Sequence, residues 1–115
     1  MNEHSDRLLS FLGIARKAGK LSLGFDSVCD SAAKREACLV LTAADTSEGT
    51  LRKLRNRLPE GFADIHTLPC GIDDIQGALG KGTRLISVND KGFALKIREL
   101  LAAECGTQSG TGEDK

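Results

Sequence analysis

Residues 38–43 read Cys-Leu-Val-Leu-Thr-Ala, an unbroken run without a charged residue. Its length suits a β-strand that is buried on both faces of a sheet. A similar run, Leu85-Ile86-Ser87-Val88, follows later in the chain, and shorter strands are predicted at residues 21–23 and 64–68. The sequence therefore predicts a sheet of four strands with a buried centre.

Amphipathic helices are predicted before, between and after these strands, because apolar side chains recur there three and four residues apart. Gly19 and Gly80 are placed to end two of the helices, and Asp90 is placed to cap the last. Asp45 and Glu48 predict a capping box at the start of the third helix. The predicted apolar faces are Leu8, Phe11, Leu12 and Ala15; Phe25, Val28, Cys29 and Ala32; Leu51, Leu54 and Leu58; Ile72, Ile75 and Leu79; and Phe93, Ile97, Leu100 and Leu101.

Helix and strand alternate along the whole chain, which places helices on both faces of a central sheet. We therefore predict an α/β protein, a three-layer α/β/α sandwich with a central four-stranded mixed sheet, formed by residues 1–105 as a single domain. Residues 106–115 are small and polar, which predicts a disordered tail. The predicted core around the sheet contains Leu12, Val40, Leu41, Ile86 and Val88.

Length and charge limit the possible functions. The chain has 115 residues, with 16 basic and 16 acidic side chains and a formal net charge of zero. A neutral chain is poorly suited to coating a nucleic acid, so an anionic partner must be bound by a local patch. No apolar run approaches the ~18 residues of a membrane span, and the first ten residues lack a signal-peptide pattern. We expect a soluble, cytoplasmic protein with no membrane contact.

Motifs for catalysis and metal binding are missing from the sequence. The four cysteines are too widely spaced for paired metal ligands, and we expect small buried thiols rather than disulfides. The segment Gly80-Lys81-Gly82-Thr83 resembles a phosphate loop, but it lacks the glycine spacing of nucleotide-binding loops. Only two histidines could supply a general base near neutral pH. We therefore expect no enzymatic activity, no cofactor and no metal.

Glycine turns beside basic residues are the remaining candidates for a site. Gly24 follows the first predicted strand, with Lys20 just before it, and residues 80–84 precede the fourth strand with Lys81 and Arg84. In a sandwich of parallel strands, loops at the strand ends gather at one edge beside helix N-termini. Backbone N–H groups can hold an anion there, and glycine lets a phosphate or a base come close. The alternative is that Gly24 only makes a tight turn.

Four segments of the chain carry a family resemblance. They are residues 11–21 (FLGIARKAGKL), the Gly24 turn, residues 39–45 (LVLTAAD) and residues 78–94 (ALGKGTRLISVNDKGFA). In these segments the chain resembles the bacterial YlxQ-type proteins, which belong to the superfamily of kink-turn-binding ribosomal proteins of archaea and eukaryotes. The resemblance covers residues 8–100. It implies an α/β/α fold and a small protein that binds structured, kink-turn-like RNA.

The resemblance also implies partners and a surface. The partners are structured RNA, ribosomal or other, together with proteins of the ribosome or of the transcription machinery, and we expect a monomer. The implied RNA-binding residues are Lys20, Gly24, Phe25, Asp26, Ser27, Asp45, Gly80, Lys81, Gly82, Thr83 and Arg84. The kink-turn binders carry Asn or Lys, then Glu or Gln, then Lys after the glycine, where this chain has Asp26, Ser27 and Asp30. The two carboxylates weaken attraction to phosphates.

Alternatives remain for several of these residues. Phe25 either stacks on an RNA base or packs in the core. Asp26 either accepts hydrogen bonds from a guanine edge or caps the second helix. The basic residues of the third helix are either a second RNA contact or a solvated surface; they are Arg52, Lys53, Arg55 and Arg57. Asp26 and Asp30 also suggest an alternative function, a protein-interaction adaptor of the same fold without tight RNA binding.

Overall fold

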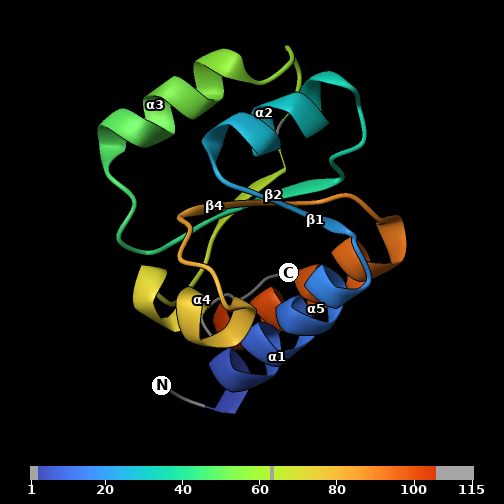
Figure 1. Cartoon of the computed structure of the whole chain (residues 1–115), viewed down its shortest axis with the longest axis vertical. Helices are drawn as coiled ribbons and strands as arrows, with labels where there is room; N and C mark the ends of the chain where they lie inside the picture. Colours follow the sequence, from blue (N-terminus) through green and yellow to red (C-terminus); the bar gives the residue numbers. More distant parts are fainter. Residues whose placement is uncertain (1–2, 63, 106–115) are drawn as a thin grey trace.

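The computed structural model describes residues 3–62 and 64–105 (Figure 1). Five helices and four strands alternate in these residues, as the hydrophobic pattern predicts. The elements are α1 (Glu3–Lys17), β1 (Leu21–Leu23), α2 (Phe25–Ala33), β2 (Leu39–Thr42), α3 (Glu48–Arg57), β3 (Ile65–Thr67), α4 (Ile72–Leu79), β4 (Leu85–Val88) and α5 (Lys91–Cys105). The predicted tail, residues 106–115, lies outside the described residues.

The four strands form one mixed sheet in the order β1-β4-β2-β3. β4 pairs antiparallel with both β1 and β2, whereas β2 and β3 are parallel. The strands β1, β2 and β3 therefore run in one direction and β4 runs against them. The predicted four-stranded mixed sheet is confirmed.

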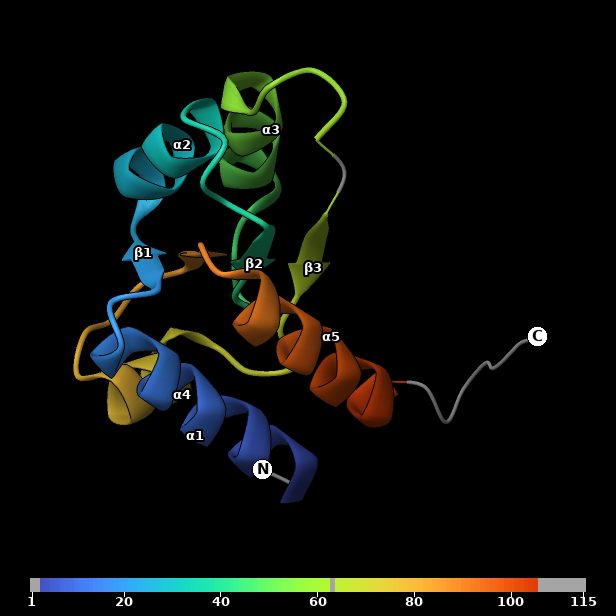
Figure 2. The same cartoon turned by 90° about the vertical axis from the view of Figure 1, so that its right-hand side faces the viewer.

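Helices cover both faces of the sheet, which confirms the predicted three-layer sandwich. α2 and α3 lie on one face, and α1, α4 and α5 lie on the other (Figures 1 and 2). Side chains alternate along each strand, so Leu39 and Leu41 join the core beneath α1, α4 and α5 while Val40 joins the core beneath α2 and α3. The five predicted core residues, Leu12, Val40, Leu41, Ile86 and Val88, are all 0% exposed.

Most of the predicted helix ends are confirmed. Gly19 and Gly80 follow α1 and α4 with φ angles of 76° and 80°, a conformation that favours glycine. Asp90 accepts a hydrogen bond from the Phe93 backbone N–H at 3.0 Å, as a cap does. None of the helices within the described residues combines the length and the apolar composition needed to span a bilayer.

The predicted capping box of Asp45 and Glu48 is wrong. The cap of α3 is Ser47, whose hydroxyl oxygen accepts a hydrogen bond from the Thr50 backbone N–H at 3.2 Å. The Asp45 side chain instead accepts from the backbone N–H of Ile72 at 3.3 Å, at the start of α4. The side chain that caps α3 is therefore the one directly next to the helix, and Asp45 is free to join a loop to a different helix.

Candidate nucleic-acid interface

The predicted glycine turn and the predicted basic loop meet at one edge of the sheet. The backbone N–H of Gly24 donates to the carbonyl of Leu85 at 2.9 Å, and the backbone N–H of Ala43 donates to the carbonyl of Arg84 at 2.8 Å. The start of β4 thus lies between the ends of β1 and β2. We name this surface the Gly24 edge; it comprises residues 24–27, the loop at Ala44 and Asp45, and residues 82–84.

The orientation of β4 brings these segments together. If β4 were parallel to β1 and β2, its start would lie at the edge opposite their ends. The assumption of parallel strands therefore does not explain the position of this loop. Because β4 is antiparallel to its neighbours, its beginning lies beside their ends. The Gly24 turn and the end of the loop before β4 thus lie together, because of antiparallel rather than parallel pairing.

Gly24 has a backbone conformation that other residues rarely adopt. It is the N-cap of α2, with φ 96° and ψ 159°, and no side chain caps the helix there. No heavy atom lies within 4 Å of the point where a side chain would begin. Gly24 offers no side chain to cap the first-turn N–H groups of α2, and the helix dipole makes this end attractive to anions. The predicted alternative that Asp26 caps this helix is wrong, because Gly24 occupies the cap.

Asp45 and Arg84 connect the loops that flank the Gly24 edge. The Arg84 Nε lies 4.0 Å from the Asp45 Oδ1, and the two side chains are 50% and 47% exposed. The guanidinium therefore remains open to a further anionic partner. Asp45 also accepts from the Ile72 backbone N–H, and its carboxylate lies against Gly71, where a Cβ would come within 3.1 Å of Oδ2.

Two predicted residues lie away from this surface. The carbonyl of Lys20 accepts from Asn89 at 2.8 Å, at the other end of β1 from Gly24. Four residues of extended chain separate the two by about 13 Å. Gly80 ends α4 next to Arg16, whose guanidinium donates to the Leu79 carbonyl. From there the loop returns along α4, where Gly82 lies near Ile72 and Gln76.

Phe25 packs in the core rather than presenting a free ring. It is half-buried against the hydrophobic cluster beneath α2 and α3. The Arg57 guanidinium of α3 lies 5.6 Å from the centre of its ring, a cation–π contact. A base could stack on the ring face that Arg57 covers only after Arg57 moves aside. The sequence pattern places Arg57 outside the apolar face of α3. Its contact with Phe25 depends on how α2 and α3 pack together, which the sequence pattern does not show.

The remaining predicted residues differ in how accessible they are. Asp26 and Ser27 are exposed in the first turn of α2, Asp30 is exposed further along it, and Lys81 is exposed before β4. Thr83 is only 6% exposed, and its hydroxyl donates to the Leu85 carbonyl at 3.0 Å. Thr83 therefore shapes the loop that carries Arg84 instead of facing a ligand.

The described cysteine side chains differ in how deeply they are buried. Cys29 and Cys70 are buried, and Cys38 is half-buried. Burial raises the pKa of the Cys29 thiol, an effect that Arg57 opposes and that Asp26 and Asp30 increase. Within residues 3–62 and 64–105, no group of three His, Cys, Asp or Glu side chains could hold a metal ion.

Comparisons with known proteins agree with this fold. No family model matches the chain. A protein of Enterococcus faecium, named RNA-binding protein YlxQ, is 28% identical over 106 residues, which cover 88% of this chain and 98% of that protein. A solved structure of a protein with unknown function from Bacillus halodurans C has a TM-score of 0.72 and 27% identity, covering 82% of this chain and 95% of that chain.

A more distant structure shares the architecture. The 15.5kD RNA binding protein of Giardia lamblia matches with a TM-score of 0.64 and 17% identity, covering 90% of this chain and 88% of that chain. At this identity the likeness concerns the fold alone. The chain and the Enterococcus protein, in contrast, align over nearly the whole of that protein. The predicted resemblance to the YlxQ-type proteins is thus confirmed.

Proposed function

We propose that this protein binds structured, kink-turn-like RNA at the Gly24 edge. The observation that carries the proposal is the hydrogen bond between the Gly24 N–H and the Leu85 carbonyl, at 2.9 Å. This bond holds the Gly24 backbone next to Leu85, the residue after Arg84. A glycine that RNA can approach closely and a cation therefore belong to neighbouring segments. RNA recognition needs both, because phosphate contacts position the strand and close contacts distinguish bases.

Phosphates are bound at this edge by a cation and by backbone donors. The Arg84 guanidinium is half exposed, and Lys81 is exposed in the same loop. The first-turn N–H groups of α2 lack a side-chain cap. Guanidinium groups and uncapped backbone N–H groups both donate strong hydrogen bonds to phosphate oxygens. Asp45 holds Arg84 in place, and Lys20 is left out of the proposed surface because it lies at the other end of β1.

The polar side chains at the start of α2 contact the edges of RNA bases. Asp26 and Ser27 are exposed there, beside the open backbone of Gly24. A carboxylate accepts hydrogen bonds from the N–H groups of guanine, and a serine hydroxyl both donates and accepts. Unpaired bases of a kinked RNA present such edges, whereas a regular RNA duplex hides most of them.

The relatives support a binding protein rather than an enzyme. The Enterococcus and Giardia proteins are both named for RNA binding. The finer part of the proposal is that this chain, as a monomer in the cytoplasm, meets its RNA in the ribosome or in the transcription and translation machinery. It rests on the resemblance to the superfamily of ribosomal proteins.

Fluorescence anisotropy with two labelled hairpins tests the proposed function. One hairpin contains a kink-turn, and the other has the same length and a regular stem. We expect tighter binding of the kink-turn hairpin, with an affinity that falls steeply as salt rises, because bound phosphates release counterions. Equal binding of both hairpins would remove the kink-turn specificity. No salt-dependent binding of either hairpin would favour the protein-interaction adaptor.

A further inference from the structure

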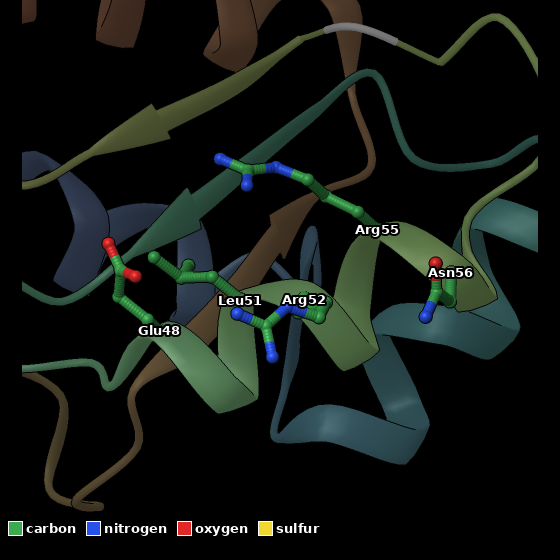
Figure 3. Close-up of a pocket in the computed structure, with 5 residues that line it drawn as sticks. All are labelled: Glu48, Leu51, Arg52, Arg55 and Asn56. Atoms are coloured by element: carbon green, nitrogen blue, oxygen red, sulfur yellow. The ribbon is translucent and has the colours of Figure 1, made fainter.

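One flank of α3 forms a basic pocket outside the Gly24 edge. Glu48, Leu51, Arg52, Arg55 and Asn56 line a pocket of about 250 Å³ (Figure 3). Arg52 and Arg55 are three residues apart, which places them on the same side of the helix. Both side chains are exposed. The whole helix carries four basic residues and one acidic residue in a protein of zero net charge.

Neither arginine forms an ion pair with a residue that the structure describes. Among the described residues, Arg84 is paired with Asp45, Lys96 with Glu99 and Arg98 with Asp64, but no ion pair involves Arg52 or Arg55. Arg57 lies over the Phe25 ring of α2. Because residues two positions apart do not face each other on a helix, Arg55 lies on a different flank from Arg57. The flank with Arg52 and Arg55 is therefore unoccupied and positively charged.

This flank continues from the Gly24 edge. α3 begins at Glu48, three residues after Asp45, which belongs to that edge. α2 and α3 lie on the same face of the sheet, and both begin at the end of the strand before them (Figure 1). At 1.5 Å per residue, Arg52 and Arg55 lie about 6 and 10 Å along the axis from the start of α3. An RNA bound at the edge can thus extend along this helix.

We propose that Arg52 and Arg55 bind the sugar–phosphate backbone of an RNA helix that flanks the structured element held at the Gly24 edge. This inference rests on the proposed function and adds a second contact to it. Arginine binds phosphate oxygens through paired N–H donors, and two arginines one turn apart can hold two neighbouring phosphates. The Asn56 amide and the Glu48 carboxylate lie in the same pocket, where a ribose 2′-hydroxyl can donate or accept.

An acidic protein surface fits the flank less well. Protein interfaces rely on buried aromatic or aliphatic anchors at their centre. The pocket offers only the half-buried Leu51 as an apolar side chain, and charged or amide side chains form the rest of its lining. The residues that line the pocket therefore favour the sugar–phosphate backbone of RNA as its partner over an acidic protein surface.

Salt-dependent binding of two kink-turn hairpins tests this inference. One hairpin has short stems, and in the other a stem is lengthened by about one helical turn. In Arg52→Gln/Arg55→Gln, binding of the long-stem RNA should weaken and its log–log salt slope should fall by about two units, at roughly one unit per lost phosphate contact. Binding of the short-stem RNA should stay at the wild-type level. Glu48→Gln should tighten binding of the long-stem RNA, because a carboxylate repels phosphates.

The control is Lys91→Gln/Lys96→Gln, which removes the same charge from α5 on the other face of the sheet. It should leave both hairpins bound as in the wild type. If the arginine variant binds the long-stem RNA like wild type while Arg84→Ala is impaired, the second contact is overturned and the proposed function stands. If the wild type binds neither RNA, both are overturned. An acidic peptide that binds the wild type but not the arginine variant, with RNA binding unchanged, would assign the flank to a protein and also overturn the inference.

Discussion

The Arg84 guanidinium and the Asp45 carboxylate face each other across the Gly24 edge, with Nε and Oδ1 4.0 Å apart. Arg84 precedes β4 and Asp45 follows β2, so the pair joins two loops that are distant in sequence. Asp45 also accepts from the Ile72 backbone N–H at 3.3 Å, which adds the start of α4 to the same cluster. One exposed carboxylate thus positions the cation that we propose for phosphate binding.

This ion pair should contribute little to folding. Both side chains are about half exposed, so solvent screens their attraction. In a double-mutant cycle of Asp45→Ala and Arg84→Ala, we expect a coupling free energy of about 1 kcal/mol or less from urea denaturation. A coupling well above this value would show that the pair is a structural element of the fold and that Arg84 is not available to RNA.

A polar network between β1, β4 and α2 should contribute more. The Asn89 amide donates to the Ser22 hydroxyl at 2.9 Å and its carbonyl accepts from Ser87 at 3.0 Å, while the Ser22 and Ser31 hydroxyls are 2.6 Å apart. Asn89→Ala leaves the buried Ser87 hydroxyl without its acceptor and removes one donor from Ser22, which keeps its bond to Ser31. We expect a loss of about 1–3 kcal/mol in the free energy of unfolding. Asn56→Ala, at an exposed position of α3, is the control and should change it by less than about 0.5 kcal/mol. Equal effects of the two variants would contradict the network's role.

Gly24→Ala separates folding from binding. At φ 96° and ψ 159° a Cβ costs on the order of 1–3 kcal/mol, although no atom stands in its way. Gly19→Ala is the control, because Gly19 has φ 76° and equally open surroundings but follows α1 next to Lys20. We expect both variants to lower the melting temperature and only Gly24→Ala to weaken RNA binding in protein that remains folded by circular dichroism. Equal RNA affinities of the two folded variants would argue against close approach at Gly24.

Charge reversal at Asp30 tests the departure from the kink-turn binders. Asp30 is exposed on α2, where those proteins carry a lysine. Asp30→Lys removes a repulsion and adds an attraction, so binding of a kink-turn RNA at low salt should tighten by roughly tenfold. Glu36→Lys makes the same change in charge just after α2, near the opposite edge of the sheet, and should have a much smaller effect. Equal tightening by both variants would mean that only the net charge matters.

The fold could be predicted because local patterns carry it. The apolar runs at 39–42 and 85–88 and the helical stripes between them determine each element, and the glycines at 19 and 80 end helices as expected. Strand direction could not be predicted in this way, because an apolar run such as Leu85–Val88 has the same pattern in parallel and antiparallel pairs. The start of β4 lies at the Gly24 edge because β4 is antiparallel to its neighbours, and the sequence pattern does not specify that direction.

The candidate site was predictable only in part, for a related reason. Gly24, Asp26 and Ser27 are neighbours in sequence, so one motif places them together. Lys20 is also near Gly24 in sequence, but an extended strand carries it to the other end of the sheet. The contact of Arg57 with Phe25 and that of Asp45 with Ile72 join residues from separate elements. Such contacts arise from packing and leave no local pattern.

The most direct test of the proposed RNA site compares two single cations at opposite ends of one sheet. The measurement is the salt dependence of kink-turn RNA affinity for wild type, Arg84→Gln and Lys20→Gln, which lose the same charge. We predict that Arg84→Gln weakens binding and lowers the log–log salt slope by about one unit, while Lys20→Gln leaves the slope unchanged. A wild-type slope in Arg84→Gln together with a reduced slope in Lys20→Gln would contradict RNA binding at the Gly24 edge, because RNA would then lie at the opposite edge of the sheet.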